Sequence, residues 1–131
     1  MIHVIDSSVL IAISKGEPGA EGAMELLLTN ECVISSVNLA EVGTKLIDFG
    51  LPAHELSRGL SQFSLDAIDF DTEQATACAA LRALTREQGL SLGDRACLAL
   101  AKHLQGCAVT ADRAWGDLDE AAVGVRVQLI R

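Results

Sequence analysis

Four acidic residues that lie far apart in the sequence each stand at the edge of an apolar segment. They are Asp6 at the end of IHVID, Glu41 within SSVNLAEV, Asp94 in LGDRACLALA and Asp112 directly after AVTA. Carboxylates that gather in one place repel one another unless a divalent cation lies among them. If the fold brings these four together, the sequence predicts a metal site and, with it, phosphodiester chemistry.

Each acid also has a simpler interpretation on its own. Asp6 could cap a following helix, and Glu41 could pair with Lys45 at the i, i+4 spacing on a solvated face. Asp94 could only complete a capping box, and Asp112 could only be a first-turn acid favoured by the helix dipole. The apolar context favours the shared site, because ionised groups at buried edges need a partner. The sequence offers no obvious cluster of Lys or Arg that would serve all four.

Strand-like and helix-like segments alternate along the sequence and would position these acids. The expected strands are residues 2–5, 32–35, 67–70, 107–110 and 125–130. The expected helices cover residues 8–14, 20–28, 37–49 (capped by Ser36), 54–63, 71–88 and 92–105, each bounded by capping residues, Gly or Pro. This alternation is typical of an α/β domain with a mainly parallel sheet, in which ligands bind beyond the carboxyl ends of the strands. Asp6 and Asp112 follow strand ends, while Glu41 and Asp94 lie near helix starts, so all four are expected at one edge.

The bulk composition limits the possible classes of protein. A chain of 131 residues that is 50% hydrophobic fits one globular domain over residues 1–131. No apolar run approaches the length of about 20 residues that a membrane helix needs, and the first residues lack the features of a signal peptide. We therefore expect a cytoplasmic protein without membrane contact. The four cysteines, which form no metal-binding or redox motif, are expected to be free buried thiols.

The formal net charge of −8 argues against a protein that coats nucleic acid non-specifically, since such proteins are usually basic. It does not exclude a nuclease, because bound cations would offset part of the acidic charge. An acidic surface also favours a basic protein partner. With no tyrosine and 3% aromatic residues, the chain is not expected to stack single-stranded bases.

Four segments together resemble the PIN-domain ribonucleases and, within that family, the VapC-type toxins of bacterial toxin–antitoxin pairs. The segments are DSSVLIA, SSVNLAEV, LSLGDRACLALA and VTADRAW. The resemblance covers essentially the whole chain, although residues 51–69 carry no diagnostic motif. It implies a three-layer α/β/α fold with a central, mainly parallel, five-stranded sheet.

The same resemblance implies an endoribonuclease that depends on Mg²⁺ or Mn²⁺ and leaves 5′-phosphate and 3′-hydroxyl ends. It carries the family's acidic quartet, as catalytic and metal-binding residues, onto Asp6, Glu41, Asp94 and Asp112. It also implies a homodimer and a cognate antitoxin whose basic C-terminal segment wraps the toxin.

Five further residues are candidates for secondary roles. Ser7 and Thr110 could orient the oxygens of metal ligands, or they could cap helices. Arg95 and Arg113 each follow an acid of the quartet and could contact substrate phosphates, or they could face solvent. Asp117 is either a fifth acid of the site or a surface residue.

Three other functions remain open as alternatives. A phosphoacceptor signalling domain usually needs an adjacent acidic pair after its first strand, and here Asp6 is followed by Ser7. A phosphatase with an aspartyl nucleophile would want a second Asp at position 8, which is Ser8. A non-catalytic PIN-like interaction module is the more serious rival, and the complete acidic quartet argues against it.

Overall fold

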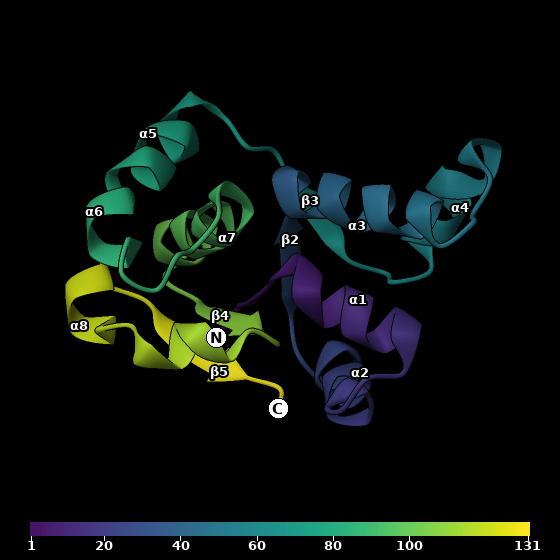
Figure 1. The fold of residues 1–131 in the computed structure, drawn as a ribbon, viewed down its shortest axis with the longest axis horizontal. Helices are drawn as coiled ribbons and strands as arrows, with labels where there is room; N and C mark the ends of the chain where they lie inside the picture. Colours follow the sequence, from purple (N-terminus) through teal and green to yellow (C-terminus); the bar gives the residue numbers. More distant parts are fainter.

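The computed structural model describes residues 1–131 as a sheet of strands surrounded by helices (Figure 1). The strands are β1 (His3–Ile5), β2 (Cys32–Ser35), β3 (Asp66–Ile68), β4 (Cys107–Thr110) and β5 (Arg126–Leu129). The α-helices are α1 (Ser7–Lys15), α2 (Ala20–Thr29), α3 (Ser36–Asp48), α4 (Leu56–Ser61), α5 (Thr72–Ala80), α6 (Arg82–Thr85), α7 (Leu92–His103) and α8 (Glu120–Val123). Two 3₁₀ helices are η1 (Ala53–Glu55) and η2 (Arg113–Asp117).

The strands form one sheet in the order β3-β2-β1-β4-β5, and every neighbouring pair is parallel. The predicted five-stranded parallel sheet is therefore confirmed. The chain runs outward from β1 through β2 to β3 and then returns to the other side of β1 for β4 and β5. The order thus reverses between β1 and β4, which is where ligands bind in open α/β sheets.

Both faces of the sheet are buried, which explains why its central strands are almost wholly apolar. Successive residues point to opposite faces, so Val4 and Ile5 belong to different core clusters, as do Ala108 and Val109. One cluster includes residues of α5 and α7, and the other includes residues of α1 and α2. Figure 1 shows these two helix groups on opposite sides of the sheet, which confirms the three layers.

The helix boundaries differ from expectation at three places. The helix expected over residues 71–88 is divided at Leu81, whose carbonyl accepts a hydrogen bond from Thr85 Oγ1 at 2.9 Å. Residues 113–123, for which no helix was expected, form η2 and α8. The cap of α3 is Ser35 and not Ser36, whose hydroxyl instead accepts from the Phe70 N–H at 3.0 Å and ties α3 to the end of β3.

The helices are short, and α3, with 13 residues, is the longest. No helix combines the length and apolar character required to cross a membrane. All four cysteines are free thiols, of which three are buried and Cys32 is half-buried.

Candidate active site

Asp6 occupies the centre of the candidate site, at the carboxyl end of β1. It stands at the N-cap position of α1, yet its side chain makes no capping hydrogen bond. Its carboxylate is instead only 1% exposed, and Oδ2 accepts hydrogen bonds from Ser8 Oγ at 2.5 Å and Thr110 Oγ1 at 2.9 Å. The simpler interpretation of Asp6 as a helix cap is therefore wrong. Thr110, at the end of β4, fixes this carboxylate from the neighbouring strand.

The surroundings of Asp6 raise its pKa to about 7. Burial is the largest cause, because it disfavours the charged form. The hydrogen bond from Ser8 lowers the pKa, the charge of Asp94 raises it, the hydrogen bond from Thr110 lowers it and the charge of Glu41 raises it. Two other acids of the quartet thus lie close enough to Asp6 to repel its negative charge.

Glu41 projects from α3 toward the same region and is half-buried. Its Oε1 accepts hydrogen bonds from Ser7 Oγ and from Asn38 Nδ2, each at 3.0 Å. Glu41 forms no ion pair with Lys45, since the structure contains a single ion pair, between Arg131 and Glu17. The i, i+4 interpretation of Glu41 is therefore wrong, and Ser7 orients this carboxylate from the start of α1.

Asn38 is fully buried beneath the acids, and the sequence analysis missed it. Its Nδ2 donates to Glu41 Oε1 at 3.0 Å and to the Gly93 carbonyl at 3.0 Å, with a longer contact of 3.5 Å to Asp6 Oδ1. Because all three neighbours are acceptors, the amide nitrogen must face them. Asn38 Oδ1 has no hydrogen-bond partner. The signal that could have revealed Asn38 is its i, i+3 spacing to Glu41 on one helix face.

Gly93, in the first turn of α7, is the second residue that the sequence analysis missed. A Cβ built on Gly93 would collide with both carboxylate oxygens of Glu41. The absence of a side chain at position 93 therefore lets the Glu41 carboxylate lie against the start of α7.

Asp94 follows in the same turn and has two roles in the structure. It completes the predicted capping box: its Oδ2 accepts from the Ser91 N–H at 2.8 Å, and its own N–H donates to Ser91 Oγ at 3.2 Å. Burial raises the pKa of Asp94, the hydrogen bonds from Ser91 lower it and the nearby charge of Asp112 raises it. Asp94 thus caps α7 and also lies in the electrostatic field of the other acids.

Asp112, just beyond β4, is the exposed member of the quartet. It is the N-cap of η2, and its Oδ1 accepts from the Ala114 N–H at 3.0 Å. The Asp112 N–H donates to Thr110 Oγ1 at 3.1 Å, so Thr110 connects Asp6 with the start of the Asp112 loop.

The four acids therefore lie toward the carboxyl edge of the sheet: Asp6 and Asp112 follow β1 and β4, Asp94 is in the first turn of α7, and Glu41 is in the second turn of α3. Their side chains stand apart, since no group of three or more His, Cys, Asp or Glu side chains is arranged to enclose an ion. Mg²⁺ keeps several waters and is usually bound through one or two carboxylates, so a site for it does not need all four acids as direct ligands. The donors are hard oxygens, and the buried Asp6 carboxyl would gain a compensating charge from a cation.

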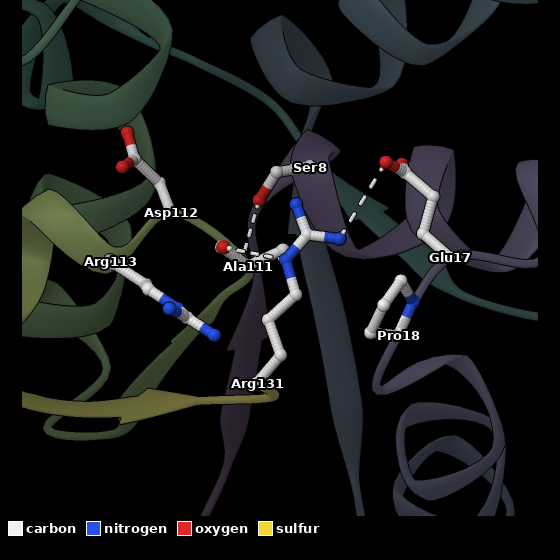
Figure 2. A pocket seen from close by; sticks show the side chains of 7 residues that line it. All are labelled: Ser8, Glu17, Pro18, Ala111, Asp112, Arg113 and Arg131. Atoms are coloured by element: carbon white, nitrogen blue, oxygen red, sulfur yellow. Dashed lines mark hydrogen bonds and ion pairs between the residues drawn. The ribbon is translucent and has the colours of Figure 1, made fainter.

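The remaining candidates lie in different surroundings. Arg95 Nη1 donates to the Cys78 carbonyl at 3.1 Å and so connects α7 to α5. Asp117 is exposed at the end of η2. Arg113 is exposed and lines a polar hollow of about 560 Å³ beside Asp112 (Figure 2).

Comparisons with known proteins agree with this architecture. A model of the PIN domain family matches residues 3–121 of the sequence. No curated protein matches it. Among solved structures, a toxin–antitoxin complex from Klebsiella pneumoniae superposes with a TM-score of 0.74 at 21% identity, covering 98% of both chains.

Two further solved structures share this fold. DNA-bound VapBC from Salmonella typhimurium has a TM-score of 0.74 at 20% identity and covers 100% of this chain and 99% of its own. VapC20 from Mycobacterium tuberculosis, a toxin that cleaves the sarcin–ricin loop, has a TM-score of 0.71 at 16% identity and covers 94% and 95%. The predicted VapC-like architecture is confirmed. Because the family model spans nearly the whole sequence, this chain belongs to the PIN domain family.

Proposed function

We propose that this chain is the toxin of a VapBC-type toxin–antitoxin pair and acts as a metal-dependent endoribonuclease that hydrolyses RNA phosphodiester bonds. The observation that carries the proposal is the placement of Asp6, which is 1% exposed, held by Thr110 at the end of β4 and connected through Asn38 to Glu41 and to the first turn of α7. Burial, and after it the charges of Asp94 and Glu41, raise the pKa of Asp6. Such a group of carboxylates is stable only with a compensating cation or protons. The similar fold of VapC20, which cleaves the sarcin–ricin loop, supports RNA as the substrate class.

The quartet Asp6, Glu41, Asp94 and Asp112 would hold Mg²⁺ or Mn²⁺, directly or through water. When bound, such an ion supplies Lewis acidity toward a phosphate oxygen and makes a water molecule more acidic. The protein's own contribution is to hold the carboxylates in place. Thr110 fixes Asp6 from β4, and the capping box fixes Asp94 at the start of α7.

Glu41 has a different role in this proposal, because its longer side chain reaches the site from α3. Its Oε1 is held by Ser7 and Asn38, which leaves Oε2 without a hydrogen bond in the structure. Glu41 can therefore bind the ion or orient the attacking water through Oε2. Ser7 and Asn38 act through Glu41 and are positioning residues.

The proposal includes a homodimer and a cognate antitoxin with a basic C-terminal segment. The net charge of −8 and the anionic site favour a basic inhibitor. Similar folds occur in toxin–antitoxin complexes from Klebsiella pneumoniae and Salmonella typhimurium. Co-expression with the product of a neighbouring short reading frame should relieve any growth arrest that this chain causes.

The direct test is cleavage of a structured RNA by the purified chain with Mg²⁺, with Mn²⁺ and with EDTA. Cleavage should require metal and should be lost in Asp94→Asn, whose amide oxygen can still accept the capping hydrogen bond. Asp119→Asn is the matched control, since Asp119 caps α8 through hydrogen bonds to Ala121 and Ala122 and is exposed. Equal cleavage by the two variants would refute the assignment.

A non-catalytic interaction module predicts a different result. The chain would then bind its partner but cleave no RNA with either metal, and Asp94→Asn would leave partner binding unchanged. Partner binding without metal-dependent cleavage in the wild type would therefore favour this second function.

A further inference from the structure

The polar hollow beside the acids is lined by two arginines that the proposed chemistry does not use. It lies where β4 and β5 end and has a volume of about 560 Å³. Its walls are Ser8, Glu17, Pro18, Ala111, Asp112, Arg113 and Arg131. Figure 2 shows Arg113 and Arg131 extending into it from different segments, while the Asp112 carboxylate points away from both.

Arg131 is held by two contacts and keeps hydrogen-bond donors that no residue uses. Its Nε donates to the Ala111 carbonyl at 3.2 Å, and its Nη1 lies 3.6 Å from Glu17 Oε2. These two contacts leave Nη2 without a partner, and the side chain is 28% exposed. A guanidinium fixed in this way loses little conformational entropy when it binds an anion.

Arg113 provides the second positive charge. It is exposed and forms no ion pair, because the only ion pair in the structure is that of Arg131 with Glu17. Free guanidinium groups match phosphate geometry better than any other side chain. The wall of the hollow also carries the carboxylates of Glu17 and Asp112, of which Glu17 is paired with Arg131 and Asp112 points away. Arg113 and the free Nη2 of Arg131 are therefore the donors that the hollow offers to an anion.

The hollow shares part of its wall with the candidate active site. Ser8, which lines it, donates to Asp6 Oδ2 at 2.5 Å, and Asp112 belongs to both. A nucleic acid strand whose reacting phosphate lay at the acids would therefore place a neighbouring phosphate at the hollow.

We propose that Arg113 and Arg131 together bind a backbone phosphate of the RNA strand, next to the phosphate that is cleaved. This inference rests on the proposed ribonuclease function and adds a substrate-positioning site to it. Arg113 and Arg131 contact the substrate and not the reacting phosphate, so their loss weakens RNA binding without removing the chemistry. Phosphate contacts carry no base information, so the effect is the same for RNAs of different sequence.

The test combines cleavage kinetics with binding of a short fluorescein-labelled RNA hairpin, measured by fluorescence anisotropy. Arg113→Gln should raise both KM and the dissociation constant about tenfold and leave kcat nearly unchanged. The slope of log affinity against log salt concentration should fall by about one, as expected for the loss of one phosphate contact. Arg113→Lys, which keeps the charge, should restore part of the affinity. Arg131→Gln should have a similar effect, with its melting temperature measured because Arg131 also contacts Ala111.

Arg126→Gln is the matched control, because Arg126 is an exposed arginine at the opposite end of β5. It should leave KM, affinity and salt dependence unchanged. The inference is overturned if Arg113→Gln behaves like Arg126→Gln while the wild type cleaves RNA. If the wild type binds the hairpin in an Arg113-dependent way but never cleaves it, the phosphate site stands and the ribonuclease proposal fails. A wild type that neither binds nor cleaves RNA contradicts both.

Discussion

The carboxylate of Glu41 lies directly against the Cα of Gly93, at the contact between α3 and the first turn of α7. This contact brings the acid of α3 beside the start of α7, one residue before Asp94. Asn38 reinforces the same junction, since its amide donates to both Glu41 and the Gly93 carbonyl. The approach of α3 to α7 therefore determines where Glu41 stands relative to Asp94.

Replacing Gly93 with alanine should damage the site more than the fold. The new Cβ would displace the Glu41 carboxylate, which is the mobile end of a side chain, while alanine is the better helix former. We expect RNA cleavage to fall by about ten- to a hundredfold, with little change in melting temperature. Gly22→Ala is the control, because a Cβ there meets nothing within 4 Å. Full activity in Gly93→Ala would show that the position of Glu41 does not matter.

Asn38→Asp should destabilise the protein although it leaves no cavity. The substitution places a carboxylate oxygen where the buried amide nitrogen now faces Glu41 Oε1 and the Gly93 carbonyl. We expect the free energy of unfolding at pH 8 to fall by about 3–5 kcal/mol, as for an uncompensated buried charge, and by less at pH 5. Urea unfolding of this variant beside Asn30→Asp, at an exposed position, measures the effect. Equal losses in the two variants would mean that the Asn38 amide is not needed as a donor.

The pKa of Asp6 predicts how the stability of the metal-free protein depends on pH. Folding raises this pKa from 3.8 to about 7, so the folded protein binds more protons than the unfolded chain between these values. The contribution of Asp6 to stability is therefore complete below about pH 4 and is lost as the pH rises toward 7, with a slope of up to about 1.4 kcal/mol per pH unit. Urea unfolding in EDTA should show this slope in the wild type and a smaller one in Asp6→Asn. The prediction fails if the two slopes coincide.

Divalent cations should restore the stability that the metal-free protein loses as the pH rises. An ion that binds only the folded protein stabilises it by about 2.7 kcal/mol at a concentration of a hundred dissociation constants. We expect Mg²⁺ and Mn²⁺ to raise the melting temperature at pH 8 in the wild type and in Asp119→Asn, but much less in Asp94→Asn. Thermal unfolding followed by circular dichroism measures this difference. A melting temperature that does not respond to millimolar metal would count against a metal site.

The sequence patterns predicted the three central strands well because β1, β2 and β4 are short, mostly apolar and largely buried runs. The edge strands β3 and β5 are partly exposed, and β3 covers Asp66–Ile68, not residues 67–70. Residues 71–88 were predicted less well, because no residue in the sequence marks the division at Leu81. Thr85 donates to the Leu81 carbonyl, but Thr44 and Thr76 make the same hydrogen bond inside unbroken helices. The missed helix α8 did have a local signal, since Asp119 precedes it and Gly124 ends it in the left-handed conformation.

In the candidate site, too, residues with a local sequence signal were predicted, whereas residues that depend on distant contacts were not. Asp6, Asp94 and Asp112 could be found because each directly follows a strand or opens a helix. Asn38 and Gly93 were missed because their importance depends on a contact between helices that lie 55 residues apart in the sequence. Single-sequence patterns do not report such contacts.

We propose that Asp6, Glu41, Asp94 and Asp112 hold one divalent ion, directly or through water. The most direct measurement is an anomalous difference map from a crystal of the wild-type protein soaked in Mn²⁺. We predict a strong peak at bonding distance from at least one carboxylate oxygen of Asp6, Asp94 or Asp112, and no such peak in crystals of Asp94→Asn. A wild-type crystal with no peak at this edge of the sheet, or with Mn²⁺ bound only elsewhere, would contradict the proposed metal site.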